Sequence, residues 1–166
     1  GTGMMRLLVD AGADVDKQGD DGWTALMMSA WCGGEHAAGK MRLLVDAGAD
    51  ANAQDEDGWT ALMIAAEHGR EHGEAMMRAL VDAGADANKQ QKDGRTALMQ
   101  AAQSGSEHGA EMMRLLVDAG ADANKQDEDG TTALMFAAGH GGEHGAGMMR
   151  LLLDAGADAN TQDENG

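Results

Sequence analysis

Glutamate–histidine pairs are the side chains in this sequence best suited to acid–base or metal chemistry. They recur every 36 residues, at Glu35-His36, Glu71-His72, Glu107-His108 and Glu143-His144. Zinc holds nitrogen ligands at about 2 Å, so two ligands of one ion lie only about 3–4 Å apart. Stacked helices are separated by about 8–10 Å. Pairs in successive copies of a stacked helical repeat therefore cannot share one ion.

Histidines four residues apart within one copy are a second metal candidate, because that spacing places both on one face of a helix. His68 and His72 have this spacing, but Gly69 lies between them and weakens a helix there. The same interrupted spacing recurs at His140 and His144. We predict no metal site. The simpler interpretation is that each Glu favours a helix N-terminus through the helix dipole and each His is a repeated surface residue.

A nucleophilic pair is suggested only by Cys32, which stands four residues before His36. The position of Cys32 holds His68, Ser104 and His140 in the other copies, so the cysteine is a single departure from the repeat. The Gly-rich segments neither follow a strand nor lead into Lys-Ser or Lys-Thr, as a phosphate-binding loop requires. We therefore predict no catalytic residue, no cofactor and no enzymatic activity.

The elements that position these side chains are predicted to be helices. The 166 residues include 14 Met, one Phe and no Tyr or Pro, so the core must consist of Leu, Met, Ala and Val. Such a core suits closely packed helices better than a β-sandwich, which favours β-branched and aromatic side chains. The Met residues fall at core-facing spacing, which predicts that they fill the core.

The net charge limits the class of partner. A formal charge of −17, with 12 basic residues spread along the chain, disfavours nucleic acid and anionic membranes, which both need clustered Lys and Arg. No apolar run approaches the ~20 residues of a membrane span. A single cysteine cannot form an internal disulfide, which favours an intracellular setting over secretion.

An internal repeat of 36 residues organises the whole chain. Asp-Gly recurs without slippage at Asp21-Gly22, Asp57-Gly58, Asp93-Gly94 and Asp129-Gly130. A fixed period of this size is typical of stacked supersecondary units. In each unit we expect a first helix capped by Thr, a break at Gly, and a second helix that stops at a left-handed Gly. In the second full unit these positions are Thr60, Gly69 and Gly84.

The sequence at 57–66, Asp-Gly-Trp-Thr-Ala-Leu-Met-Ile-Ala-Ala, and that at 80–88, Leu-Val-Asp-Ala-Gly-Ala-Asp-Ala-Asn, resemble the ankyrin repeat. The resemblance extends over essentially the whole chain. It implies an all-α solenoid of stacked helix-turn-helix units joined by β-turn or hairpin-like fingers. The expected boundaries are a partial repeat at 1–21 and repeats at 22–57, 58–93, 94–129 and 130–165, with both ends of the array cut within a repeat.

Two features depart from the family pattern. The family's Thr-Pro-Leu-His is Thr-Ala-Leu-Met here, so Met packing must replace the hydrogen bonds of that histidine. The period is 36 instead of 33. The three extra residues lie between the two helices, and we expect them to lengthen a helix end or the loop on the side away from the fingers. Arg78 and Asp82 are expected to form an exposed pair on the second helix.

Equivalent positions of the copies form a column, and columns whose residues vary among otherwise similar copies indicate where a partner binds. The resemblance implies that finger tips and first helices line a concave groove for partners. We therefore predict that the groove is a non-catalytic protein–protein interaction surface. The residues assigned to it are Trp23, Met28, Trp31, Trp59, Ile64, Glu67, Arg95, Gln100, Gln103, Thr131 and Phe136.

Tryptophan is enriched in binding hot spots, which favours a binding role for Trp31. Trp23 and Trp59 follow the turn Gly, and each either binds a partner or braces its finger. Acidic residues in the fingers would complement a partner with a basic rim. An alternative is a self-assembling structural protein, in which copies of the chain stack end to end into filaments through their uncapped terminal repeats.

Overall fold

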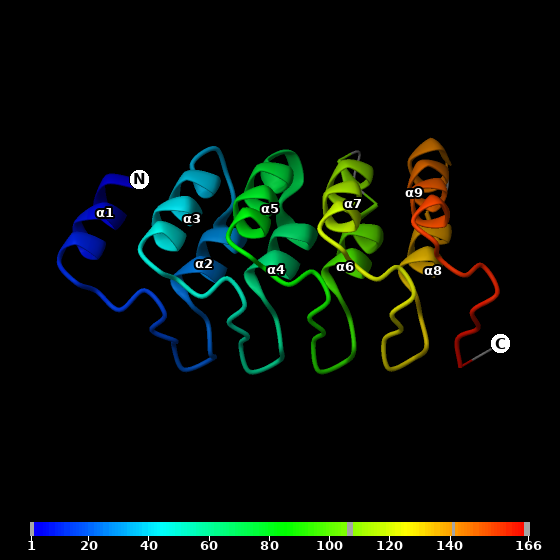
Figure 1. The fold of residues 1–166 in the computed structure, drawn as a ribbon, viewed down its shortest axis with the longest axis horizontal. Helices are drawn as coiled ribbons and strands as arrows, with labels where there is room; N and C mark the ends of the chain where they lie inside the picture. The colour runs from blue at the N-terminus through cyan, green and yellow to red at the C-terminus, as the bar shows by residue number, and fades with distance from the viewer. Residues whose placement is uncertain (1, 106–107, 141, 165–166) are drawn as a thin grey trace. The chain divides into compact units, whose positions relative to one another are not determined.

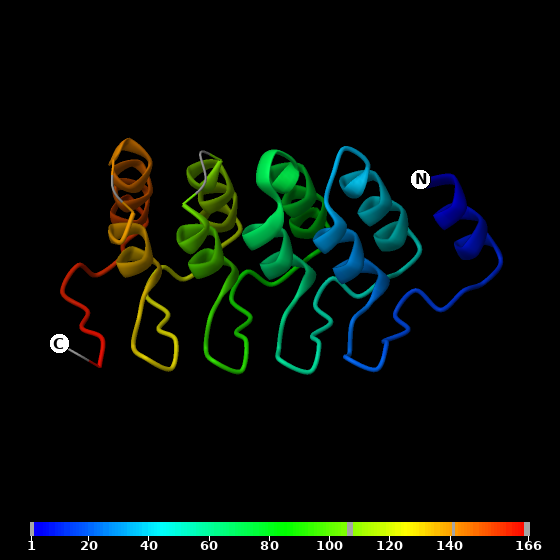
Figure 2. The same ribbon diagram turned by 180° about the vertical axis from the view of Figure 1, so that it is seen from behind.

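The computed structural model describes residues 2–105, 108–140 and 142–164, and these residues form helices and loops without a β-strand. The chain divides into two compact units, Gly1–Asp86 and Ala87–Gly166, and each is described by itself. In both units a repeat consists of two helices followed by a finger-like loop (Figures 1 and 2).

In unit 1, α2 and α4 are the first helices of two successive repeats, and each is followed by a second helix. α2 packs on α3 and α4, α4 packs on α5, and α3 packs on both α1 and α5. The bounds in unit 1 are α1 (Thr2–Asp10), α2 (Ala25–Cys32), α3 (Ala37–Asp46), α4 (Ala61–His68), the 3-10 helix η1 (Arg70–His72) and α5 (Gly73–Asp82).

Unit 2 repeats this arrangement with two helix pairs. α6 packs on α7 and α8, and α9 packs on α7 and α8. The bounds in unit 2 are α6 (Ala97–Ser104), α7 (Gly109–Asp118), α8 (Ala133–Ala138) and α9 (Gly142–Asp154).

The predicted threonine caps are confirmed at the start of every first helix. Thr60 has extended backbone geometry, and its Oγ1 accepts a hydrogen bond of 3.2 Å from the backbone N–H of Met63. This bond satisfies one of the N–H groups that the first helical turn leaves without a partner. The same bond, at 3.3–3.4 Å, is made by Thr24, Thr96 and Thr132.

The second helices end at a left-handed glycine, as predicted. Gly84 has φ +83°, its N–H donates to Val81 O at 2.9 Å, and the N–H of Ala85 donates to Leu80 O at 3.0 Å. These bonds pair carbonyls of the last helical turn, and glycine adopts the required conformation without the steric cost of a Cβ.

The core of each unit consists of methionine, leucine and alanine. Met63 and Leu62 in α4 and Met76 and Leu80 in α5 are almost completely buried. In unit 2 the equivalent residues, Met99, Leu98, Met112 and Leu116, are buried to the same extent. Core filling by Met at these positions is confirmed. Alanine between them allows close helix contact, and the flexible thioether fills the remaining space.

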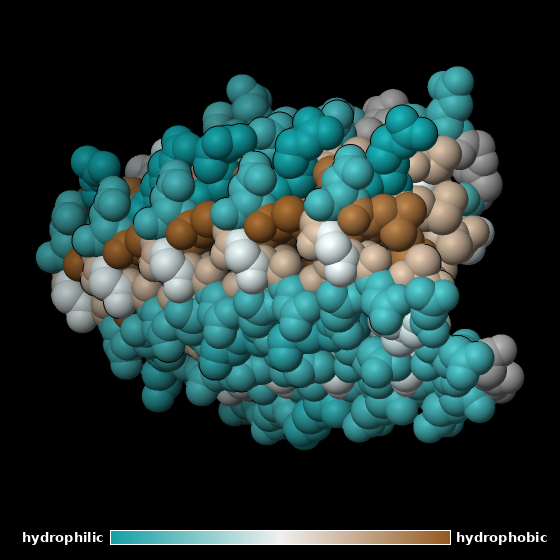
Figure 3. Space-filling model, turned by 45° about the vertical axis from the view of Figure 1, so that its right-hand side comes forward, coloured by the Kyte–Doolittle hydropathy of each residue, from teal (hydrophilic) through white to brown (hydrophobic). Residues whose placement is uncertain are grey.

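Apolar side chains also reach the surface. On the face that carries the second helices, Figure 3 shows apolar surface between hydrophilic surface above it and the hydrophilic finger region below it. The second helices are also amphipathic, because α5 and α7 bury one face and expose Arg78 and Arg114 on the other.

Each finger closes as a hairpin-like turn. In the finger before α4, Asp55 N donates to Trp59 O at 3.1 Å and Gly58 N donates to Asp55 O at 3.1 Å. Neighbouring fingers within a unit are also joined, since Glu56 N donates to Asp21 O at 3.4 Å and Glu128 N donates to Asp93 O at 2.8 Å. The hairpin-like fingers expected from the family resemblance are thus present, although the described residues contain no ladder long enough to be a strand.

Two details differ from, or refine, the expectations. Arg78 does not pair with Asp82; its Nη2 lies 2.8 Å from Glu74 Oε1, one turn earlier. This order, acid before base, is the more favourable one in a helix, which explains the outcome. In the second full repeat the segment between the helices contains the short η1. Figure 1 shows the connection from α4 to α5 on the side away from the fingers.

Candidate functional site

Two tryptophans and a histidine form an aromatic cluster in unit 1. The ring centroids of Trp23 and Trp31 are 5.8 Å apart with planes at 77°, and those of Trp31 and His68 are 4.3 Å apart with planes at 72°. Both contacts are edge-to-face, the arrangement that the ring quadrupole favours. Trp31 is nevertheless 53% exposed. The cluster therefore holds a large apolar ring in place at the surface.

The elements that position the cluster follow directly from the repeat. Trp23 comes after the turn glycine of its finger, Trp31 lies in the last turn of α2, and His68 is the last residue of α4. Because α2 packs on α4, the ends of the two helices bring Trp31 and His68 together. Sequence reasoning placed His68 in a variable column without assigning it to the site. Its variation among copies was the signal available.

A cleft of about 410 Å³ opens beside Trp31 at the ends of α2 and α4. Both helices direct their C-terminal carbonyls toward this end, which gives it a partial negative charge. The cleft is lined by Trp31, Cys32, Gly33, Gly34, His68, Gly69, Glu71 and His72.

The other predicted residues of unit 1 differ in accessibility. Met28 in α2 is 48% exposed, whereas Ile64, at the equivalent position of α4, is 1% exposed. Ile64 is therefore a core residue in this structure and is not available to an exposed docking surface. Trp59 is half-buried, and its backbone N–H donates to Asp55 Oδ1 at 2.8 Å. Glu67 lies on the surface with its Oε2 3.3 Å from His68 Nε2.

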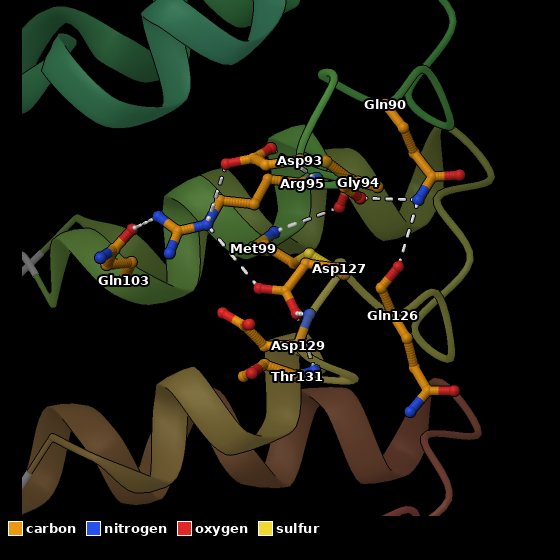
Figure 4. A network of polar contacts seen from close by, with 11 residues as sticks. Gln90, Asp93, Gly94, Arg95, Met99, Gln103, Gln126, Asp127, Asp129 and Thr131 are labelled. Atoms are coloured by element: carbon orange, nitrogen blue, oxygen red, sulfur yellow. Dashed lines mark hydrogen bonds and ion pairs between the residues drawn. The ribbon is translucent and has the colours of Figure 1, made fainter. Parts of the chain in front are cut away.

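In unit 2 the residues at the positions of Trp23 and Trp31 are Arg95 and Gln103, and their side chains form a hydrogen bond with each other. Arg95 Nη1 donates to Gln103 Oε1 at 2.9 Å, and Arg95 Nε lies 3.5 Å from Asp93 Oδ2 and 3.7 Å from Asp127 Oδ2 (Figure 4). The guanidinium carbon also lies 5.1 Å from the ring centroid of Phe136. Arginine thus has carboxylate, amide and aromatic partners inside its own unit.

The remaining predicted residues of unit 2 are Thr131 and Gln100. Thr131 uses its backbone N–H to donate to Asp127 Oδ1 at 2.8 Å. Gln100 is only 2% exposed, and its Oε1 is buried without a hydrogen-bond partner. Like Ile64, Gln100 is therefore buried and is not available to an exposed docking surface.

Possible metal ligands and the cysteine nucleophile were also located in the structure. Across residues 2–105, 108–140 and 142–164, no three His, Cys, Asp or Glu side chains are grouped so as to hold a metal ion. His68 ends α4 and His72 lies in η1, so the two do not share a helix face. Cys32 is an exposed free thiol. Glu107 lies outside the described residues.

Comparison with known proteins identifies the repeat. The family model for ankyrin repeats (3 copies) matches residues 1–90 and 71–163. No curated protein is similar enough to match the chain. Within the described residues, none of the helices combines the length and apolar character that crossing a bilayer requires. With helix pairs and fingers repeating through both units, and family matches over nearly its whole length, the chain belongs to the ankyrin repeat family.

Proposed function

We propose that the chain is a non-catalytic protein-recognition module and that its partner docks on one surface of unit 1. We call this the Trp31 surface and define it by Trp23, Met28, Trp31, Trp59 and Glu67. Ankyrin repeats are generally protein-interaction modules, which supports a role in protein recognition. The observation that carries the choice of the Trp31 surface is the 53% exposure of Trp31, a ring with two aromatic contacts.

A fixed, exposed tryptophan favours binding for two reasons. It offers a large apolar area whose burial is favourable, and Trp is the residue type most enriched in binding hot spots. Because Trp23 and His68 contact the Trp31 ring and restrict its rotation, Trp31 loses little side-chain entropy when a partner covers it. The adjacent exposed Met28 adds a flexible apolar contact.

The contrast between the units supports the choice of unit 1. In unit 2, Gln103 stands at the position of Trp31 and Arg95 at that of Trp23, and these two side chains bond to each other. They are therefore committed to intramolecular contacts, whereas Trp31 is 53% exposed and Trp23 is half-buried. Finger carboxylates around the tryptophans favour a partner with a basic rim.

The proposal is tested with Trp31→Ala and the matched control Gln103→Ala, which truncates the equivalent position of unit 2. Partners are first captured from native extract, and the affinity of each purified partner is then measured by calorimetry. Trp31→Ala should weaken binding by at least about thirtyfold, as expected for a hot spot of 2 kcal/mol or more. Gln103→Ala should change it less than about twofold. Unchanged helicity by circular dichroism, with equal binding by wild type and Trp31→Ala, contradicts the proposal.

End-to-end association of copies is a second candidate. In α1, Met4, Leu7 and Leu8 are exposed, and Met28 in α2 is exposed although Ile64, in the same column, is buried. A helix pair from a second copy could cover Met28 much as the interior of unit 1 covers Ile64. Such a contact is heterologous, so it propagates instead of closing.

Sedimentation velocity over a wide concentration range tests this candidate. Self-association should give species that grow with concentration, and Met28→Lys should abolish them. The control Ala75→Lys adds the same charge at an exposed position of α5 and should leave them unchanged. A single monomeric species at the highest concentration contradicts end-to-end association, and electron microscopy of the same sample shows whether filaments are present.

A further inference from the structure

We propose that the Trp31 surface binds an arginine side chain of its protein partner, with the guanidinium against the Trp23–Trp31 pair. This inference rests on the proposed function and specifies the chemistry of the partner. Its basis is a comparison within the chain, because unit 2 carries its own guanidinium at the equivalent place.

Unit 2 shows which groups this part of a repeat offers a guanidinium. Arg95 lies near two carboxylates, those of Asp93 at 3.5 Å and Asp127 at 3.7 Å, and 5.1 Å from the centroid of an aromatic ring, that of Phe136. Its Nη1 donates to Gln103 Oε1. Figure 4 shows the guanidinium between the finger carboxylates and the side chain of Gln103. The place is thus acidic, flanked by an aromatic ring, and filled by an internal cation.

Unit 1 keeps the two carboxylates in the same setting. Asp21 Oδ1 accepts from Trp23 N at 3.2 Å, as Asp93 Oδ1 accepts from Arg95 N at 3.1 Å. Asp55 Oδ1 accepts from Trp59 N at 2.8 Å, as Asp127 Oδ1 accepts from Thr131 N at 2.8 Å. Equal backbone bonds hold equivalent carboxylates, so the acidic part of the site is repeated.

The internal cation, however, is missing from unit 1. Trp23 replaces Arg95 and Trp31 replaces Gln103. In the part of the chain that the structure describes, neither Asp21 nor Asp55 forms an ion pair with a Lys or Arg side chain. The two carboxylates therefore lie in the finger of Trp23 and in the finger bonded to it, without the positive charge that balances their counterparts in unit 2.

Arginine fits this combination better than other side chains. Tryptophan is the strongest cation–π partner among the aromatic residues, and a planar guanidinium can stack on an indole while its N–H groups reach carboxylates. The rings of Trp23 and Trp31 are in edge-to-face contact at 77°. The 53% exposure of Trp31 leaves part of this pair open to a guanidinium. Glu67 lies 3.3 Å from His68, the ring that contacts Trp31, and so brings a third carboxylate to this end of α4.

The test uses a hexapeptide of alternating alanine and arginine, acetylated and amidated, and the same peptide with citrulline in place of arginine. Citrulline keeps the planar shape and removes the charge. Binding is followed by NMR on the ¹⁵N-labelled chain through the indole Nε1–H signals of its three tryptophans, assigned with Trp→Phe variants. The arginine peptide should shift the Trp23 and Trp31 signals saturably, and the citrulline peptide should bind about three- to tenfold more weakly.

The carboxylates are tested with Asp21→Asn combined with Asp55→Asn. Asparagine keeps the oxygen that accepts the finger N–H bonds, so the fingers remain closed while two charges are lost. This variant should bind the arginine peptide about three- to tenfold more weakly. The control, Asp46→Asn with Asp82→Asn, removes the same charge from exposed second-helix positions of unit 1. It should change the affinity less than about twofold.

The outcomes separate this inference from the proposed function. Equal affinity for both peptides, or equal weakening by both double variants, overturns the arginine inference. If a captured partner requires Trp31 but the arginine peptide moves no indole signal, protein recognition stands and the inference is wrong. If the peptide binds as expected but Trp31→Ala leaves partner binding unchanged, the cation site stands and the proposed docking surface is wrong.

Discussion

Asn124 and Asp158 are 34 residues apart in sequence, and the backbone N–H of Asp158 donates to Asn124 Oδ1 at 2.7 Å. The side-chain Nδ2 of the same asparagine donates to Gly156 O at 3.0 Å. One side chain thus joins its loop to the end of the next second helix. The same two bonds are made in unit 1, where Asn52 bonds to Asp86 N and Gly84 O. The asparagine therefore acts as a bridge between successive repeats.

Removing this bridge should destabilise unit 2. Asn124→Ala deletes both bonds, and because the groups are exposed, water can pair with the atoms that remain. We expect the free energy of unfolding to fall by about 1–2 kcal/mol, measured by urea denaturation. Asn160→Ala is the matched control, because Asn160 occupies the same column but its Nδ2 donates only to Asp158, two residues earlier. Equal losses for the two variants would show that the bridge contributes nothing.

A substitution of Gln91, in the finger before α6, is predicted to stabilise the chain. Asp127 Oδ1 accepts from the backbone N–H groups of Asp129 and Thr131, at 3.1 and 2.8 Å, and so closes its finger. Gln91 stands at the equivalent position, and its Nε2 is buried without a partner. The backbone bond between Gln91 and Arg95 already closes this finger, and Gln91→Asp should add the carboxylate bonds and remove the unpaired group. We expect the free energy of unfolding to rise by about 1 kcal/mol.

The reciprocal change provides the control for this prediction. Asp55→Gln places glutamine in a finger of unit 1 where the carboxylate accepts from Asp57 N and Trp59 N. It should lower the free energy of unfolding by a similar amount. Urea denaturation of both variants measures the two effects. Stabilisation by Asp55→Gln, or destabilisation by Gln91→Asp, would show that the finger carboxylate is not the cause.

The periodic part of the fold was predictable because its causes are local. Thr60 caps α4 and Gly84 ends α5 through bonds to residues within five positions, and the 36-residue period repeats these signals. The same holds for the buried Met63, whose spacing follows the helix period. A local signal repeated in every copy is the kind that a single sequence can reveal.

The site was only partly predictable, because variation at a position among copies does not show whether the side chain there is buried or exposed. Met28 and Ile64 share a column, yet one is exposed and the other is in the core, since burial depends on the helices packed around each. The bond from Arg95 to Gln103 joins a finger to a helix end eight residues later, and no spacing rule predicts it. Sequence reasoning identified the columns, and the structure was needed to separate their members.

The turn glycine of a finger should be required for contact between fingers as well as for its backbone conformation. Gly94 has φ +82°, and a Cβ there would lie 2.9 Å from Asp127 Cα in the next finger, where only backbone could move. Gly120 has φ +87°, and a Cβ added to it would have no other atom within 4 Å. Gly120→Ala should therefore cost only the conformational penalty of about 1–2 kcal/mol. Gly94→Ala should cost more than that in urea denaturation, and equal costs would exclude the contact between fingers.

A buried amide in α6 should be replaceable with a gain in stability. Gln100 is 2% exposed, and its Oε1 has no hydrogen-bond partner, while the equivalent position of α4 holds the buried Ile64. Burying an unpaired polar atom costs about 1–3 kcal/mol, and methionine has nearly the same shape as glutamine without that atom. Gln100→Met should therefore raise the free energy of unfolding by about 1–2 kcal/mol in urea denaturation.

Gln103→Met is the control for this prediction. It makes the same chemical change at an exposed position whose side chain accepts a hydrogen bond from Arg95, and it should give no gain in stability. A gain of equal size in both variants would mean that methionine favours the helix by itself and that the unpaired oxygen has no measurable cost.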